Sequence, residues 1–165
     1  MNVTIRAYTP DDVTAAAEIW NQVVLDGVAF PQLETLDELR GDAFFREQSF
    51  TGLAVSEETG EILGLYILHP NNVGRCGHIA NASYAVRRDC RGRGIGEQLV
   101  RHSLKKGKEL GFRLMQFNAV VASNTRARAL YRKLGFVPLG IIPGGFRMPD
   151  GRYEDICPYY YEFTD

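Results

Sequence analysis

The sequence predicts one α/β domain, and three observations predict this class. Short runs of apolar and β-branched residues, typical of strands, alternate with stretches in which apolar residues recur every three or four positions. Capping residues and glycine stops mark the ends of those helical stretches. Hydrophobic residues make up 45% of the chain and charged residues 24%, so its 165 residues suffice for one complete core. We therefore expect a single domain over 1–165.

The N-terminal half begins with a predicted strand at 3–8 and a helix whose start is marked by Thr9 and Pro10. Threonine can cap a helix, and proline suits its first position. Apolar residues then recur at helical spacing, which indicates a face packed in the core. They are Val13, Ala16, Ala17, Trp20, Val23 and Val24. A second capping pattern starts at Thr35 and predicts another short helix, so 26–34 becomes an interhelical loop that can cover a substrate site.

The middle of the chain predicts three strands and then a β-α-β unit. The strands lie at 51–56, 61–69 and 78–87. A helix at 94–110 follows, stops at Gly111 and leads into a strand at 112–120. Its inward-facing residues are expected to be Ile95, Leu99, Val100, Leu104 and Leu110.

The C-terminal part predicts one more helix and two closing strands. Asn124 can cap this helix and Gly135 ends it. Its apolar face comprises Ala127, Leu130, Tyr131 and Leu134. The strands are expected at 136–142 and 153–163, and the prolines and glycines of 143–151 indicate a long turn between them.

Charge and cysteine content exclude several classes of partner. The formal net charge of -1 gives no support for nucleic-acid binding. Cys76, Cys90 and Cys157 show neither the paired spacing of a zinc site nor the density of a secreted disulfide scaffold, so we expect a cytoplasmic protein without a metal. The N-terminus lacks the pattern of a signal peptide, and no apolar run is long enough to span a bilayer, so we expect no membrane partner.

The run RGRGIG, at 91–96, lies between a predicted strand and a predicted helix and has the character of an anion site. Its alternate glycines let the backbone approach a ligand, and the helix start adds unpaired N–H groups with a partial positive charge. Each N–H to phosphate contact contributes about 1.5–3 kcal/mol. Local positive charge comes from Arg87, Arg88, Arg91 and Arg93. A flexible loop of purely structural function is the alternative interpretation.

Two familiar nucleotide-binding patterns fail on the residues of this run. A nucleoside-triphosphate loop needs lysine and then serine or threonine after Gly96, and both are missing. A dinucleotide pattern starting at Gly92 needs glycine where Glu97 stands. What remains is R-x-x-G-x-G, followed about one β-α unit later by N-x-x-A-x-x-L-Y-x-x-x-G-F at 124–136.

With these two motifs in this order, the sequence from about 78 to 137 resembles the GCN5-related N-acetyltransferase (GNAT) superfamily. The resemblance implies a mixed, mostly antiparallel sheet of about seven strands with helices on both faces. The fourth and fifth strands, here 78–87 and 112–120, would splay apart around the pantetheine arm of acetyl-CoA, the co-substrate, and no metal would be needed. Cofactor-binding positions implied by the resemblance are Ala85, Val86, Arg91, Gly92, Arg93, Gly94, Ile95, Gly96 and Asn124.

The same resemblance implies that Tyr131 lies near the thioester sulfur as the catalytic acid and that Asn124 contacts the pantetheine arm. A departing thiolate, with a thiol reference pKa of about 8.5, benefits from such a proton donor. The alternatives are an ordinary core aromatic and a simple helix cap. His78, His69 and Glu34 are candidates for a base acting through a water chain, and the sequence does not choose among them.

On the acceptor side the sequence resembles, more loosely, the branch that acylates amino acids and their analogues, including phosphinothricin acetyltransferases. Ile5-Arg6, the 27–30 segment and the 140–155 segment carry this likeness, although Phe30 is followed by Pro31-Gln32 and not by the acid usual there. The 69–71 and 74–82 segments look more like fungal enzymes that acetylate azetidine-2-carboxylate. In those enzymes an asparagine at the position of Asn81 meets the substrate carboxylate.

We therefore expect direct acetyl transfer from acetyl-CoA to the amine of a small amino acid or amino-acid analogue. Candidate substrate-binding residues are Phe30, Asn81, Arg75 and Arg147, since an amide and a guanidinium both donate to a carboxylate. A homodimer is common among relatives. Acetylation of peptide or protein amines, and a non-catalytic acyl-CoA-binding module, remain alternatives.

Overall fold

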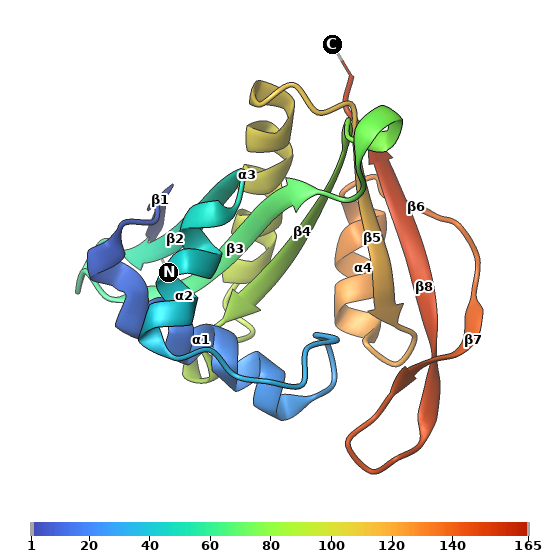
Figure 1. The fold of residues 1–165 in the computed structure, drawn as a ribbon, viewed down its shortest axis with the longest axis horizontal. Coiled ribbons are helices and arrows are strands. Elements are labelled where there is room, and N and C mark those ends of the chain that lie inside the picture. The colour runs from blue at the N-terminus through green and yellow to red at the C-terminus, as the bar shows by residue number, and fades with distance from the viewer. Residues whose placement is uncertain (1, 165) are drawn as a thin grey trace.

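The computed structural model describes residues 2–164, which fold into one eight-stranded sheet with helices on both faces (Figure 1). The strand order is β1-β2-β3-β4-β5-β8-β6, with β7 paired to β8. The strands are β1 (Val3–Ala7), β2 (Phe50–Ser56), β3 (Ile62–Pro70), β4 (Ile79–Val86), β5 (Leu114–Val121), β6 (Val137–Pro138), β7 (Ile142–Arg147) and β8 (Tyr153–Glu162). The helices are α1 (Val13–Asp26), α2 (Glu38–Glu47), α3 (Ile95–Glu109) and α4 (Thr125–Lys133).

The pairing of β4 with β5 departs from the rest of the sheet. It is parallel, whereas the other strand pairs among the described residues are antiparallel. It also ends after two residue pairs, Ile79 with Leu114 and Ala80 with Met115. Beyond these pairs the two strands diverge, as Figure 1 shows. The predicted mixed sheet, splayed between its fourth and fifth strands, is confirmed, with eight strands in place of about seven.

The two faces of the sheet carry separate cores, because successive side chains of a strand point to opposite faces. Leu65 and Ile67 of β3 pack with Trp20 of α1 on one face. Tyr66 and Leu68 pack with the α3 helix on the other. Helices α1 and α2 therefore cover one face, and α3 and α4 the other (Figure 1). Strands buried on both faces explain why β2 and β3 are almost continuously apolar in sequence.

Two of the three predicted helix caps are confirmed. Thr9 and Asp12 form a capping box around a 3-10 turn, Pro10–Asp12, that continues into α1. Asn124 caps α4, accepting the N–H of Ala127 at 3.3 Å. The predicted cap of α2, Thr35, was wrong by two positions. The cap is Asp37, whose extended backbone precedes the first turn and whose carboxylate accepts the N–H of Arg40 at 2.8 Å, as an N-cap aspartate does.

The C-terminal prediction was wrong in its strand boundaries. The strand expected at 136–142 is split into β6 and β7, and β7 runs into residues expected to form a turn. Phe146 explains the difference, since it is buried in a small cluster with Val121 and Ile156 and so draws the segment against β8. Gly145 permits this approach, because a Cβ there would lie 2.5 Å from the Ile156 side chain.

One predicted core position of α3 was also wrong. Leu110 is 45% exposed, since it is the C-terminal cap, where the chain already turns away from the sheet. Ile95, Leu99 and Val100 are buried as expected. No helix within 2–164 has both the length and the apolar composition to cross a bilayer.

Candidate functional site

A cavity of about 770 Å³ opens where β4 and β5 diverge, and its walls come from both faces of the sheet. On the α1–α2 face the wall includes Phe30, Phe44, Glu47, Gln48, Ile67, His69, Asn81 and Ser83. On the α3–α4 face it includes Ala82, Tyr84, Gly96, Val100, Phe117, Asn124, Arg126, Leu130 and Tyr131. The cavity therefore passes through the sheet at the gap that the splay leaves.

Asn81 holds the last link between the diverging strands. Its Nδ2 donates to the Gln116 carbonyl at 2.8 Å, directly after the final ladder pair of Ala80 with Met115. Beyond this link no ladder pair joins β4 to β5, so N–H and C=O groups on the facing edges remain available. An extended ligand that carries amides can pair with such an edge as an added strand would.

The loop before α3 has the backbone of an anion site. Gly92 and Gly94 have φ angles of 80° and 82°, in the left-handed region that side chains other than glycine rarely adopt. Among the described residues, nothing accepts from the N–H groups of Gly92, Arg93 or Gly94, and no side chain caps α3. These donors and the positive end of the helix thus remain free for an anion.

Two arginines of the loop are committed to a carboxylate of α1. Arg88 and Arg91 contact Asp26 at 2.7 and 3.1 Å. Burial alone would raise the pKa of Asp26, but the hydrogen bonds from these two arginines outweigh it and lower that pKa. These contacts fasten the loop to the end of α1, so both guanidiniums, which were expected to add positive charge near a ligand, also have a structural partner in Asp26.

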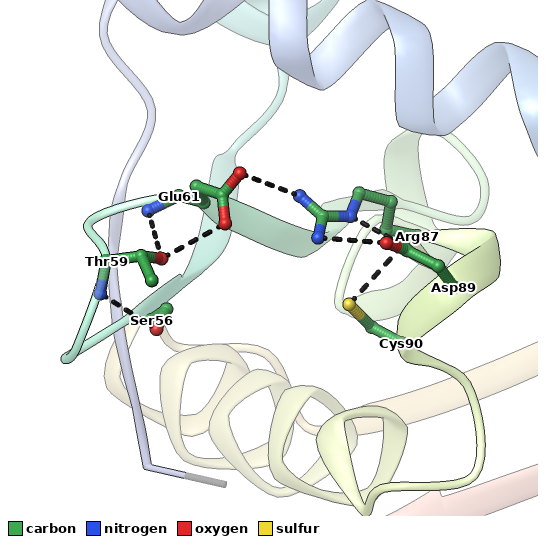
Figure 2. Close-up of polar contacts among 6 residues, drawn as sticks. All are labelled: Ser56, Thr59, Glu61, Arg87, Asp89 and Cys90. Atoms are coloured by element: carbon green, nitrogen blue, oxygen red, sulfur yellow. Dashed lines mark hydrogen bonds and ion pairs between the residues drawn. The ribbon is translucent and has the colours of Figure 1, made fainter.

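Arg87 fastens the other side of the loop. Figure 2 shows its guanidinium between Asp89, at 2.7 Å, and Glu61, at 3.6 Å, which lies in the β2–β3 connection. The buried Cys90 thiol contacts the same Asp89 carboxylate at 3.5 Å. The strand end and the loop are thereby tied to a neighbouring turn of the sheet.

The positive charge that remains free near the glycine loop comes from Arg93 and Arg126. Neither has a carboxylate within 4.0 Å in the part of the chain that the structure describes. Arg126, in the first turn of α4, lines the cavity and its Nη1 lies 3.6 Å from where a Cβ of Gly92 would stand. Arg126 was not predicted from the sequence, although its place two residues after the Asn124 cap was a usable signal.

The other expected cofactor residues contribute in different ways. Ala85 and Ile95 are 1% exposed and belong to the two cores, so only their backbone is available to a ligand. Val86 accepts from Arg91 through its carbonyl, and its side chain lies 4.0 Å from where a Cβ of the cavity-lining Gly96 would stand. Asn124 lines the cavity while it caps α4, so the two interpretations of this residue are compatible.

Tyr131 lies in the wall of the cavity within an aromatic cluster. Its ring centroid is 4.6 Å from that of Phe117 and 5.5 Å from that of Phe136. The Tyr131 hydroxyl has no hydrogen-bond partner among the described residues. Every fully buried side-chain oxygen of those residues does have a partner, so this hydroxyl is not fully buried and faces the open cavity. Burial, together with the neighbouring Tyr159, raises the pKa of Tyr131, which keeps its O–H protonated at neutral pH.

The substrate-binding candidates are divided by the structure. Asn81 lines the cavity, and Phe30 does so although it is 7% exposed and packs on Trp20 at a ring distance of 4.4 Å. Arg75, in a 3-10 turn, and Arg147, at the end of β7, are exposed and lie outside the cavity wall.

The three candidate bases are also separated. His69 lines the cavity. His78 lines a different, polar hollow with Lys108 and Arg113, and Glu34 is an exposed loop residue outside both. Glu47, which was not predicted from the sequence, reaches the cavity from the last position of α2, and no motif or capping pattern marks it.

Comparisons with known proteins agree with this geometry. The sequence profile of the Acetyltransferase (GNAT) family matches residues 16–136. N-acetyltransferase aca1 of Schizosaccharomyces pombe is 35% identical over 103 residues, 62% of this chain, and the chain spans about half of that relative, 49% of its length. The L-amino acid N-acyltransferase MnaT of Escherichia coli is 27% identical over 144 residues, covering 86% of this chain and 83% of MnaT.

Two solved structures have the same fold. A GCN5-related N-acetyltransferase from Kribbella flavida has a TM-score of 0.89 at 29% identity and covers 98% of each chain. A GNAT superfamily phosphinothricin acetyltransferase from Sinorhizobium meliloti, in complex with AcCoA, has a TM-score of 0.90 at 23% identity, covering 99% of this chain and 90% of that one. The second likeness is one of fold alone.

Proposed function

The chain belongs to the Acetyltransferase (GNAT) family, and from this premise we propose that it transfers the acetyl group of acetyl-CoA to the amine of a small amino acid or amino-acid analogue. Acyl transfer from acetyl-CoA is the chemistry of the family. The observation that carries the proposal is a cavity that crosses the sheet, with the glycine loop beside it on one face and Asn81 and His69 among apolar walls on the other. Donor and acceptor can then meet from opposite sides.

The donor side is supported by the loop and by the gap between the strands. The free N–H groups of the 92–94 loop suit the pyrophosphate, and Arg93 and Arg126 supply the positive charge. The pantetheine arm carries amides, which can pair with the open edges of β4 and β5. Asn124 lines this path, and the amide N–H groups that its capping bond does not use can donate to the pantetheine arm.

The transfer then needs two groups beyond the bound substrates. The amine attacks the thioester carbon, and the resulting oxyanion can accept from unpaired N–H groups of β4. As the C–S bond breaks, the thiolate takes a proton, and Tyr131 is a neutral O–H donor facing the cavity. The roles of Tyr131 and of the loop residues remain our proposal.

The acceptor side supports a small substrate with a carboxylate. Asn81 uses one Nδ2 hydrogen for the Gln116 carbonyl, which orients the amide and leaves its second hydrogen for a carboxylate oxygen. Phe30 and Phe44 provide apolar walls beside it. MnaT is named for L-amino acids, which favours the same substrate class. Arg75 and Arg147 lie away from the cavity, so we do not include them in the acceptor site.

A turnover screen tests the proposal. Release of CoA-SH from acetyl-CoA would be measured with free amino acids, with proline, sulfoximine and phosphinic analogues, and with peptides. We expect free amino acids or analogues to be acetylated faster than peptides. Faster reaction with peptides would contradict the acceptor class, and saturable coenzyme A binding without CoA-SH release from any amine would contradict the enzyme activity in favour of a binding module.

Arg126→Ala should weaken acetyl-CoA binding about tenfold, since one charged hydrogen bond to phosphate contributes about 1.5 kcal/mol or more. The dissociation constant would be measured by calorimetry at low and high salt, and the loss should shrink at high salt. Arg132→Ala is the matched control, because Arg132 is an exposed arginine of the same helix outside the cavity. Equal affinities for the two variants would remove Arg126 from the donor site.

Tyr131→Phe should lower kcat about 100-fold and leave the acetyl-CoA dissociation constant unchanged, because only the proton donor is lost. Single-turnover kinetics and calorimetry measure the two quantities. Tyr161→Phe is the control, since Tyr161 packs on the same aromatic cluster without lining the cavity. Unchanged turnover in Tyr131→Phe would leave this tyrosine as a packing residue.

Asn81→Ala should raise the KM for the amino acid about tenfold, the value of one lost hydrogen bond to a charged group. The amide derivative of the same amino acid is the internal control, because it lacks the carboxylate and should be affected much less. If the KM rises equally for both acceptors and the melting temperature falls, Asn81 has only a structural role through its hydrogen bond to the Gln116 carbonyl.

A further inference from the structure

We propose that His69 is the general base that removes the proton from the acceptor ammonium. The inference rests on the proposed acetyl transfer and names the group in this chain that makes the amine nucleophilic. An α-ammonium has a pKa of about 8 and is mostly protonated at neutral pH, so an amine acceptor gains from a base beside it. Three features of His69 carry the assignment: its position opposite Asn81, the identity of its free ring nitrogen, and its surroundings in the cavity.

His69 and Asn81 are direct partners in the β3–β4 register, and both line the cavity. Opposite residues of an antiparallel pair project to the same face, with Cβ atoms about 4.5–5.5 Å apart. In an α-amino acid the nitrogen is only two bonds from the carboxylate carbon. A carboxylate bound at Asn81 therefore brings the α-amine within reach of the imidazole.

A backbone contact determines which nitrogen of His69 is free. Nδ1 lies 2.9 Å from the Pro70 carbonyl oxygen, which can only accept a hydrogen bond. The neutral ring therefore carries its hydrogen on Nδ1 and leaves the Nε2 lone pair open to take a proton. The same contact holds the ring in one orientation, as the second ring nitrogen does in many histidine bases.

The surroundings favour a histidine base over the nearby carboxylate. The titratable and charged residues that share the cavity are Glu47 of α2, Tyr84 of β4, and Arg126 and Tyr131 of α4. Glu47 has no ion-pair partner among the described residues and is exposed at the rim, where it can attract an ammonium. Imidazole in general takes a proton from an ammonium more readily than a carboxylate does, because its reference pKa of about 6.5 lies closer to that of the amine.

The proton balance is simple. Nε2 of His69 takes one proton from R-NH3+, and the freed lone pair forms the C–N bond to the thioester carbon. The C–S bond breaks, and the thiolate takes the proton of the general acid. After the C–N bond forms, the nitrogen loses one more proton, which passes through solvent in the cavity to the deprotonated general acid. The His69 imidazolium releases its proton to bulk water. The products are the amide, CoA-SH and one H+.

The test compares His69→Gln and His69→Ala with His78→Gln, whose histidine lines a different hollow. The acceptor is whichever amine the wild-type enzyme acetylates best, amino acid or peptide, so a failure of the acceptor class leaves this test intact. At pH 7 we expect kcat/KM for the acceptor to fall about 100-fold in both His69 variants, with acetyl-CoA affinity and melting temperature unchanged. The loss should shrink as the pH approaches the pKa of the amine, and added imidazole should partly restore His69→Ala.

Two results would overturn the assignment. A higher acceptor KM with unchanged kcat and an unchanged pH profile would make His69 a binding residue only. A pH-dependent loss in Glu47→Gln that is absent from His69→Gln would make Glu47 the base.

Discussion

The short ladder between β4 and β5 is the constraint on which the rest of this structure depends. Two residue pairs hold the strands together, the Asn81 amide adds one more bond to the Gln116 carbonyl, and the strands then part. Because both faces of the sheet are covered by helices, the gap becomes a passage lined by side chains from both cores. A continuous ladder would have satisfied the backbone groups and closed the passage.

Some charged residues around the passage form ion pairs that hold the loop, and others have no ion-pair partner among the described residues. Asp26 pairs with Arg88 and Arg91, and Arg87 is held between Asp89 and Glu61 (Figure 2). These pairs position the loop, and the left-handed φ angles of Gly92 and Gly94 give it a backbone that other residues rarely adopt. The cations left free come from the loop and from α4, two segments that meet only in the folded chain.

Much of the fold could be predicted because periodicity, caps and glycine stops are local. The helices α3 and α4 and the strands β1 to β5 followed from such signals to within one or two residues, and α1 begins three residues after its predicted start because a 3-10 turn precedes it. The failures lay where a distant contact decides the local structure. Phe146 turns a proline- and glycine-rich segment into β7 by packing with Val121 and Ile156. The exception is the α2 cap, which is a local feature, since Asp37 accepts the N–H of Arg40 within the first turn of the helix.

The sequence by itself determined the resemblance to the family, and through that resemblance it made Asn124, Tyr131 and Asn81 candidates. The residue types of 91–96 also favoured an anion site, because alternate glycines before a helix start are a local signal. Only the tertiary structure decided which scattered polar residues share the cavity. Arg126, Glu47 and His69 line the cavity. His78 lines a different hollow, and Arg75 and Arg147 lie outside both. The physical reason is that these positions depend on strand register and helix docking across long sequence separations, which no local pattern encodes.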